Sequence, residues 1–216
     1  MKRILFAALI AGAWANTAIA EDYDWSGIYG GVSIGARWSD MDYRSPYGMV
    51  NDYWSTSGTG VTAGAFLGYN FTYGNVVFGP DIHMSFSHAN GDSATEYSGN
   101  WYQNDKRLRT RATASANMRV GYAFGRILPY VTGGYSKSWY DLTYTTRSIV
   151  MLEWSDKFNR SGWNIGTGTD WSITDNLFAR AEYRFIDLGK EDLTGSSGWS
   201  RKFKQHAATL GIGYKF

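Results

Sequence analysis

The sequence predicts an all-β fold, an eight-stranded antiparallel up-and-down transmembrane β-barrel. Three observations predict it: apolar and polar residues alternate with period two, the links between these segments alternate in length, and the chain begins with an export signal. Aromatic residues make up 17% of the chain, which argues against disorder, and 26 of the 216 residues are glycine. The chain contains no cysteine, which excludes a disulfide scaffold, a cysteine-ligated metal and a cysteine nucleophile.

Residues 1–20 have the three parts of a cleaved signal peptide. Lys2 and Arg3 give the positive start, residues 4–15 are apolar, and Ala18 and Ala20 are the small residues before a cleavage site. The apolar run is too short for a spanning helix of about 20 residues, so a retained anchor is the weaker alternative. Cleavage removes two of the 21 Lys and Arg residues and leaves 19 against 19 Asp and Glu. Residues 21–216 then form one outer-membrane β-barrel domain with no net basic footprint for nucleic acid.

Eight segments show the alternation of a strand whose two faces meet different surroundings. In the first, Ile28 and Val32 lie on the apolar face and Ser33 on the other. The eight segments are 27–38, 61–71, 76–87, 108–124, 129–144, 161–171, 177–188 and 203–216. Two residues conflict with this pattern: Pro80 favours an edge strand, and Lys137 falls on the apolar face of its segment.

The links between these segments are sorted by length. Short links lie near residues 72–75, 125–128 and 172–175, and long polar links lie near 39–58, 88–105, 145–160 and 189–202. A membrane barrel is built in this way, with long loops outside and short turns in the periplasm, and an even strand number returns both chain ends to the periplasm. A soluble barrel or sandwich is the alternative, and it gives no reason for this sorting.

Aromatic residues on the apolar face concentrate near the strand ends, whereas alanine and leucine occupy its middle. The strand-end aromatics are Trp38, Tyr69, Phe71, Tyr122, Phe124, Trp163, Trp171, Tyr214 and Phe216. Membrane barrels place aromatic girdles at both headgroup levels, whereas a soluble sandwich packs its aromatics in a mid-strand core. The pattern therefore predicts that the apolar face meets lipid.

Four stretches resemble the opacity-protein-like outer-membrane β-barrel family, in particular the small surface porins of alphaproteobacteria. They are WSGIYGGVSIGA from Trp25, VGYAFGRILPYVTGGYS from Val120, GWNIGTGTDWSITDNLFARAEYRFIDLG from Gly162 and HAATLGIGYKF from His206. The resemblance covers close to half of the mature chain and implies a barrel in the cell outer membrane that is exposed as a surface antigen. Family members are commonly called porins, and some are associated with haemin binding or host contact. The long loops match no family motif, so no ligand specificity carries over.

The last eight residues resemble the β-signal read by the outer-membrane assembly machinery. The pattern consists of Thr209, Gly211, Tyr214 and the terminal Phe216. A last strand that offers an unpaired edge suits β-augmentation by an assembling partner. The assembly machinery is therefore an expected partner, with an ordinary edge strand as the alternative.

The polar face carries balanced charges at the depth of the membrane. The deep set contains three arginines and three carboxylates: Asp81, Arg119, Asp170, Arg180, Glu182 and Arg184. The interior of an eight-stranded barrel is just wide enough for side chains, and buried charges persist when they are paired. The sequence therefore predicts a charge network that plugs the lumen, with charges lining water as the alternative. Four more inward arginines are expected nearer the long-loop rim: Arg37, Arg107, Arg109 and Arg111.

The sequence shows no constellation for catalysis or for a cofactor. Asp81, His83 and Ser85 share a strand face, but such neighbours lie about 6.5–7 Å apart, too far for the direct hydrogen bonds of a relay. Three scattered histidines without cysteine make a transition-metal site unfavourable. We therefore expect no enzyme activity, no metal and no cofactor.

Two functions remain open from the sequence. The first is a surface protein with a charge-plugged lumen that serves envelope structure and loop-mediated interactions, and the second is a small porin passing ions or small solutes. Expected partners are outer-membrane lipids, lipopolysaccharide, the assembly machinery and a haemin or host-surface ligand, but not nucleic acid. The basic stretch 106–111, with Arg147 and Arg160, is expected to attract lipopolysaccharide phosphates, with a solvated strand extension as the alternative.

Overall fold

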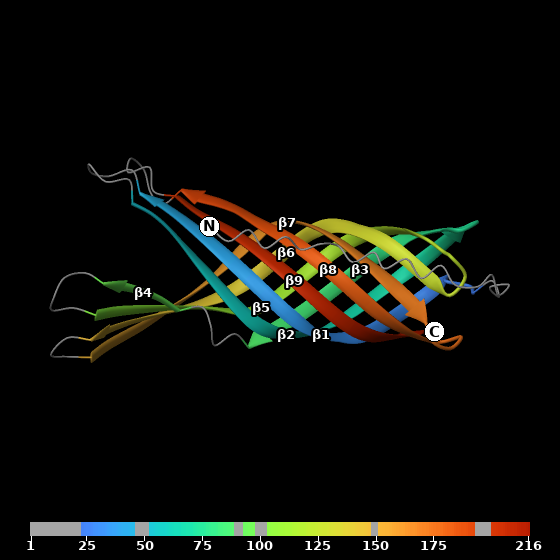
Figure 1. Ribbon diagram of the computed structural model, residues 1–216, viewed down its shortest axis with the longest axis horizontal. Helices are drawn as coiled ribbons and strands as arrows, with labels where there is room; N and C mark the ends of the chain where they lie inside the picture. The colour runs from blue at the N-terminus through green and yellow to red at the C-terminus, as the bar shows by residue number, and fades with distance from the viewer. Residues whose placement is uncertain (1–22, 46–51, 89–92, 98–102, 148–150, 193–199) are drawn as a thin grey trace, which may run out of the picture.

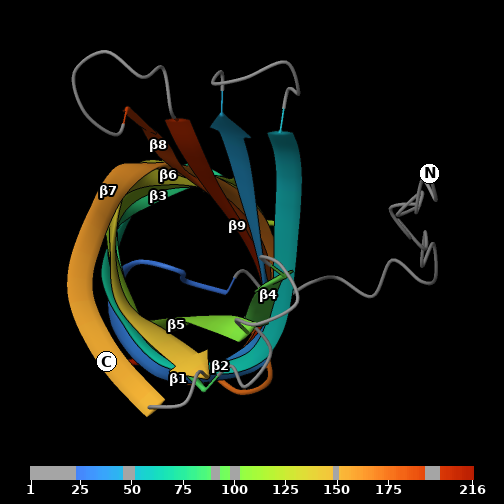
Figure 2. The same ribbon diagram turned by 90° about the vertical axis from the view of Figure 1, so that its left-hand side faces the viewer.

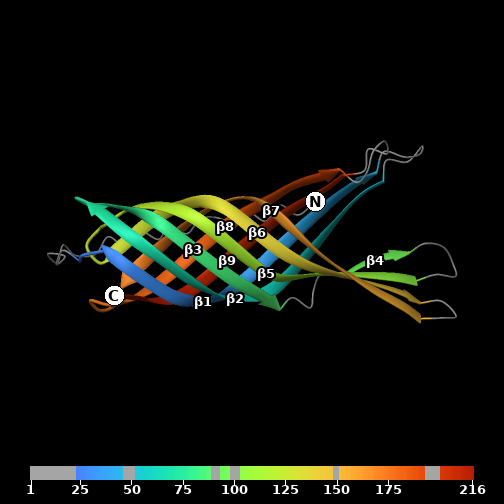
Figure 3. The same cartoon turned by 180° about the vertical axis from the view of Figure 1, so that it is seen from behind.

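The protein is an all-β closed barrel of strongly tilted antiparallel strands (Figures 1 and 3). The computed structural model describes residues 23–45, 52–88, 93–97, 103–147, 151–192 and 200–216, so the signal peptide expected at residues 1–20 lies outside the described residues. The strands are β1 (Gly27–Ser45), β2 (Asp52–Tyr73), β3 (Val76–His88), β4 (Ser93–Tyr97), β5 (Gln103–Tyr122), β6 (Ile127–Arg147), β7 (Met151–Ser172), β8 (Leu177–Asp192) and β9 (Ser200–Lys215).

Eight strands close the barrel, as predicted. Along the sheet the order is β3-β2-β1-β9-β8-β7-β6-β5-β4, and the additional pairing of β3 with β5 closes the ring around the bore seen in Figure 2. The remaining strand, β4, is a short segment that pairs with the part of β5 toward the long-loop end, from Ser93 opposite Arg107 to Tyr97 opposite Gln103. It therefore lengthens the β3 side of the sheet without adding a strand to the barrel.

The strands run farther at the long-loop end than the alternation predicted. Residues assigned to the long links at 39–58 and 145–160 are mostly strand, in β1, β2, β6 and β7. Among the described residues, β7 pairs with β8 only from Trp163 inward, and β2 pairs with β3 only from Val61 inward. Beyond these points the barrel wall divides into two sheets, β2-β1-β9-β8 and β7-β6-β5-β4, which separate toward the left of Figure 1.

The two faces of the barrel wall follow the predicted alternation. On β1, Val32 and Ile34 are 64% and 61% exposed on the outside, whereas Ser33 and Arg37 are buried inside. The register of β6 also holds, because Ser136 and Ser138 are fully buried and Lys137 between them lies on the outer face, 5.7 Å from the Trp139 ring. A closed barrel with an apolar exterior has an interior that is mostly polar, which is the reverse of a soluble sandwich.

Pro80, which conflicts with the strand pattern, lies within a barrel strand that is paired on both sides. β3 lies between β2 and β5, and Pro80 lies opposite Met118 of β5. The ladder between β2 and β3 is interrupted here, since it steps from the pair Gly68–Asp81 to the pair Phe71–Phe78. A proline has no amide hydrogen to give to a ladder, so an interior strand can hold it where the pairing is already broken.

The expectation that Arg111 faces the lumen is wrong. The register between β5 and β6 shifts between Thr110 and Ala112, so Arg111 is the extra residue of a β-bulge. Thr110 is therefore buried, while the Arg111 side chain is 57% exposed outside and lies 3.5 Å from the Asp141 carboxylate. The side chains of Arg107 and Arg109 lie outside the described residues, and Arg37 is buried in the lumen.

Aromatic side chains form two levels on the outside of the barrel. At the short-turn end, ring pairs include Tyr69–Phe71 at 4.7 Å and Tyr214–Phe216 at 5.2 Å. At the other end, Trp163 packs edge-on against Phe185 at 5.5 Å. Trp163 and Trp171 lie eight residues apart on β7, about 27 Å along a strand and about 20 Å along the axis after tilt, which suits an apolar band of about 25 Å. No helix in the described ranges is long and apolar enough to span a membrane.

Candidate functional site

Large side chains of the described residues cross the lumen. Glycines on the inner face leave room for large neighbours: a Cβ on Gly168 would lie 2.6 Å from the Tyr130 hydroxyl oxygen, and one on Gly31 would lie 2.5 Å from the Phe66 ring. Tyr130 and Phe66 are each 4% exposed. Small residues on one strand therefore let aromatic residues of other strands cross the interior.

Asp170 on β7 is the centre of a buried charge network. Both terminal nitrogens of Arg119 donate to its Oδ2 atom at 3.0 Å. Arg180 donates from Nε to Oδ1 at 2.7 Å and from Nη2 to Oδ2 at 2.8 Å. The side chains of all three residues are at most 4% exposed. Two guanidinium groups thus share one carboxylate, in the forked geometry that makes such hydrogen bonds strong.

Asp81 extends this network across the barrel to β1 and β3. Its Oδ2 atom accepts a hydrogen bond from the Tyr29 hydroxyl at 2.9 Å and a longer one from Nη1 of Arg180 at 3.5 Å. Asp81 is 3% exposed, and both of its partners come from other strands. Arg180 therefore bridges the carboxylates of Asp170 and Asp81, and Tyr29 holds Asp81, the one with the longer contact to Arg180.

Glu182 and Arg184 form a second ion pair on β8, with Arg184 Nη2 donating to Glu182 Oε1 at 2.5 Å. The Tyr130 hydroxyl donates to the other carboxylate oxygen of Glu182 at 2.8 Å. Arg119 lies 4.6 Å from the centroid of the Tyr130 ring, and Arg180 lies 5.4 Å from it. Tyr130 therefore contacts both ion-pair clusters.

Aromatic faces cover the two central guanidinium groups. Arg119 lies between the rings of Tyr29 and Tyr130, at 4.7 and 4.6 Å from their centroids. The Arg180 guanidinium lies 4.1 Å from the centroid of Phe66 and 5.5 Å from that of Phe178. Cation–π contacts of this kind are strongest where the cation is shielded from water. Each of the two guanidinium groups therefore donates hydrogen bonds to carboxylate oxygens and also lies against aromatic rings.

A layer of small polar residues lies on the long-loop side of the charges. Arg37 donates to Thr113 Oγ1 at 2.7 Å and to Ser85 Oγ at 2.6 Å. Ser115 and Ser136 are 2.7 Å apart, and Asn164 donates to Ser136 at 2.9 Å. These contacts join β1, β3, β5, β6 and β7, so this layer crosses the bore above the ion pairs.

Apolar clusters lie at both ends of the polar interior. The cluster at the short-turn end, here named the floor, contains Trp25, Tyr29, Phe66, Val77, Leu128 and Phe178. The cluster toward the long-loop end, here named the roof, contains Tyr140, Ile186, Leu188 and Phe203, with Phe158 packed against it. The lumen is thus stacked in four layers: floor, ion pairs, small polar residues and roof.

The structure brings the six deep charges into two clusters joined by Tyr130. His83 lies 3.4 Å from Ser33 and not in a relay with its strand neighbours, because Asp81 is held by Tyr29 and Ser85 by Arg37. Sequence reasoning missed the roles of Tyr29, Tyr130 and Trp25. The signal available for the two tyrosines was their inward phase, which puts a hydroxyl near the charges.

Three residues of the expected assembly signal lie on the last strand, which is paired on both sides in the finished barrel, and the fourth, Phe216, follows directly after it. Thr209 lies opposite Gly35 of β1 and Glu182 of β8, and Gly211 lies opposite Ser33 and Arg180. Tyr214 and Phe216 are exposed on the outside, and the Phe216 amide donates to the Ile28 carbonyl at 3.0 Å. Their arrangement puts two aromatic rings at the outer surface of the β1–β9 seam.

Residues 4–216 match the family model described as "Outer membrane protein beta-barrel domain". The chain is 30% identical over 207 residues to the 25 kDa outer-membrane immunogenic protein of Brucella abortus, covering 94% of this chain and 84% of the relative. It is 29% identical to the 31 kDa outer-membrane immunogenic protein of Brucella melitensis, with both chains fully covered. It is also 28% identical to a 22 kDa outer membrane protein of Rhizobium leguminosarum, covering 70% of this chain and 64% of the relative.

Solved structures give more distant matches. Ail, the attachment invasion locus protein of Yersinia pestis, is 14% identical with a TM-score of 0.42, covering 88% of this chain and 99% of that one. The outer membrane protease OmpT of Escherichia coli is 10% identical with a TM-score of 0.47, covering 88% of this chain and 96% of that one.

Proposed function

The chain belongs to the outer-membrane protein β-barrel family, and from this premise we propose that it is a surface protein whose lumen is held shut by its own side chains. Its family and its relatives locate it in the cell outer membrane. The observation that carries the proposal is the Asp170 cluster, in which one carboxylate and two guanidinium groups occupy the middle of the bore with almost no exposure.

The closure follows from the energetics of buried charge. An ion moving through this layer has to displace paired groups whose separation leaves charges without partners in a poorly hydrated interior. Breaking one such buried pair typically costs about 3–5 kcal/mol. The floor and the roof add clusters of buried apolar side chains on either side of the ion pairs, and an ion would have to pass these as well. The geometry therefore favours a structural barrel over a steady conducting pore.

The surface role rests on the long-loop end of the strands. The two sheets that extend beyond the barrel wall present their strands away from the apolar band, as a loop-mediated interaction would need. Arg111, Lys137 and Lys157 lie on the outer face of three neighbouring strands toward the long-loop end, where the Asp141 carboxylate lies 3.5 Å from Arg111 and opposite Lys157. Cations at this height match the phosphates of an outer-leaflet glycolipid such as lipopolysaccharide, and that contact is part of the proposal.

Planar-bilayer recording of the refolded protein tests the closed lumen. The wild type is expected to show rare or small openings, and Glu182→Gln is expected to show larger or more frequent ones because Arg184 loses its carboxylate partner. Asp175→Asn, which changes an exposed turn carboxylate, is the matched control and should record like the wild type. A wild type that conducts steadily, with a conductance indifferent to Glu182→Gln, would establish the alternative function of a small porin.

A further inference from the structure

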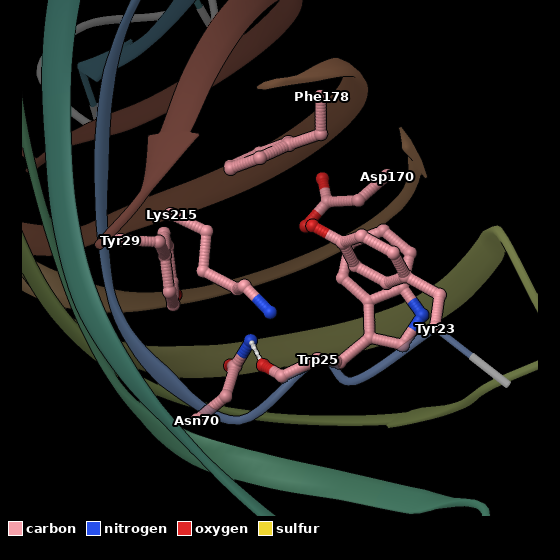
Figure 4. A pocket seen from close by; sticks show the side chains of 7 residues that line it. All are labelled: Tyr23, Trp25, Tyr29, Asn70, Asp170, Phe178 and Lys215. Atoms are coloured by element: carbon pink, nitrogen blue, oxygen red, sulfur yellow. Dashed lines mark hydrogen bonds between the residues drawn. The ribbon is translucent and has the colours of Figure 1, made fainter. Parts of the chain in front are cut away.

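The chain enters the barrel from inside its short-turn mouth. Residues 23–26 precede β1 and run across the bore instead of away from it (Figures 2 and 4). Trp25 is only 3% exposed and packs edge-on against Phe178 with ring centroids 6.3 Å apart. Gly27 has a φ of 109°, a backbone conformation that residues other than glycine rarely adopt. This conformation lets the chain turn from residues 23–26 into β1.

Hydrogen bonds tie this segment to three separate parts of the mouth. The Trp25 indole Nε1 donates to the carbonyl of Gly125, in the turn between β5 and β6, at 3.0 Å. The Asn70 amide on β2 donates to the Trp25 carbonyl at 2.9 Å. The Tyr23 hydroxyl donates to the carbonyl of Asp175, in the turn between β7 and β8, at 3.0 Å.

The last strand holds the segment from a fourth side. The Lys215 ammonium donates to the carbonyl of Asp24 and lies 4.7 Å from the centroid of the Tyr23 ring. The Tyr23 and Trp25 rings pack edge-on at 4.6 Å. Burial raises the pKa of Tyr23, so its hydroxyl keeps the proton that it donates to Asp175. Hydrogen bonds from Ser26 lower the pKa of Asp24 and fix the turn that follows.

These contacts exceed what the start of β1 requires. The β1 ladder already begins at Gly27, opposite Asn70, so the strand has its register without Trp25. The indole instead completes the floor, which separates the ion pairs from the short-turn side: Arg180 contacts the floor rings of Phe66 and Phe178 directly. Val77, a member of the same cluster, is fully buried.

We propose that residues 23–26 form an intramolecular stopper, in which the Trp25 indole occupies an aromatic binding slot and seals the short-turn mouth of the lumen. This inference rests on the proposed closed lumen and adds a second closure in series with the ion pairs. The slot is selective for a flat aromatic ring with one hydrogen-bond donor on its edge, because rings line it and the Gly125 carbonyl accepts from it. An emptied slot should therefore take free indole.

Thiol accessibility tests the stopper, since the chain has no cysteine of its own. Val77→Cys places a thiol in the floor, and a small water-soluble methanethiosulfonate is added to the refolded full chain in vesicles. The thiol should react slowly with Trp25 in place, and Trp25→Ala should raise its rate by about tenfold or more because the floor becomes open to water. Trp25→Phe, which keeps an aromatic ring, should stay near the slow rate, and free indole should slow the Trp25→Ala variant. Asn75→Cys, in the exposed turn between β2 and β3, should react quickly throughout.

A second reporter separates this inference from the closed lumen itself. The second reporter is Ser136→Cys, at a position that lies on the long-loop side of the ion pairs and is fully buried. It should stay slow with Trp25→Ala, because the ion pairs still close the bore, and it should become faster with Glu182→Gln. A fast Ser136→Cys in the unaltered barrel would refute the closed lumen, whereas a Val77→Cys rate that is already fast with Trp25 present would refute the stopper.

The folded state is verified by heat-modifiable migration of each variant. An unchanged slow Val77→Cys rate in folded Trp25→Ala barrel overturns the proposal. If Trp25→Ala yields no folded barrel, Trp25→Leu keeps an apolar side chain but removes the aromatic ring and its bond to the Gly125 carbonyl. That variant is then expected to raise the Val77→Cys rate several-fold, and an unchanged rate overturns the proposal in the same way.

Discussion

Replacing Asp170 by asparagine should destabilise the barrel more than any neutralisation at its surface. The change keeps the size of the side chain but removes the charge that two guanidinium groups share through four hydrogen bonds of 2.7–3.0 Å. The NH2 group of the asparagine side chain would also face the N–H donors of the guanidinium groups. Arg119 would then have no carboxylate partner, and Arg180 would keep only the 3.5 Å contact to Asp81.

The size of the effect follows from the burial of the three residues. Removing one partner of a buried ion pair typically costs about 3–5 kcal/mol because the other charge remains in the interior. With a urea dependence of about 2 kcal/mol per molar, a loss of about 4 kcal/mol lowers the unfolding midpoint by about 2 M. Heat-modifiable migration of protein equilibrated with vesicles at increasing urea measures this midpoint.

Asp175→Asn provides the matched control, since it removes a turn carboxylate that is 89% exposed and lies 3.3 Å from Arg126. Its cost should be at most about 1 kcal/mol, as for surface ion pairs in general. Adding Arg119→Met to Asp170→Asn removes a stranded cation and should recover part of the lost stability. Equal midpoints for Asp170→Asn and Asp175→Asn would refute the reasoning, because the network would then contribute no more than a surface pair.

Two further predictions concern topology and assembly. Epitope tags near Gly58, Gly91 and Gly195 should bind antibody on intact cells, whereas tags near Gly74, Gly125 and Asp175 should not. Gly91 and Gly195 lie outside the described residues. The reverse labelling would show that the barrel has the opposite orientation in the membrane. Deleting Phe216 should lower the amount of heat-modifiable barrel in the outer membrane, because the chain loses the aromatic residue that follows its last strand, whereas deleting Gly195, which lies outside the described residues, should not. Equal barrel levels in both deletions would contradict the role of the C-terminal pattern.

The alternation of side chains was sufficient to predict the barrel because lipid and lumen differ sharply in polarity. It located all eight barrel strands and the inner and outer faces of β1 and β6. Beyond the membrane both faces of a strand meet water, so the alternation fades while the backbone ladder continues, and the strand ends at Ser45 and Met151 were missed. The bulge at Arg111 was missed because one inserted residue leaves the composition of both faces almost unchanged.

The composition of the lumen was predictable, but its contacts were not. Phase alone placed Arg119, Asp170 and Arg180 on the inner face at similar depth. Which carboxylate each arginine meets depends on the stagger between distant strands, and the bond from Tyr29 to Asp81 joins residues 52 positions apart. Trp25 lies before the first alternating segment, so no periodicity could indicate that it turns into the bore.

The layered interior has a consequence for how the lumen opens. Apolar floor and roof layers lower the local dielectric around the ion pairs, which strengthens each pair but also raises the cost of any charge left alone. On the two proposals above, loss of Trp25 should hydrate the floor and lower the penalty for separating Arg180 from Asp170 without breaking that pair, whereas loss of Glu182 should leave the floor dry. We therefore expect the two proposed closures to be coupled through water that enters the floor. Trp25→Ala combined with Glu182→Gln should increase conductance by more than the product of the two single effects, and a purely multiplicative result would show that the layers act independently.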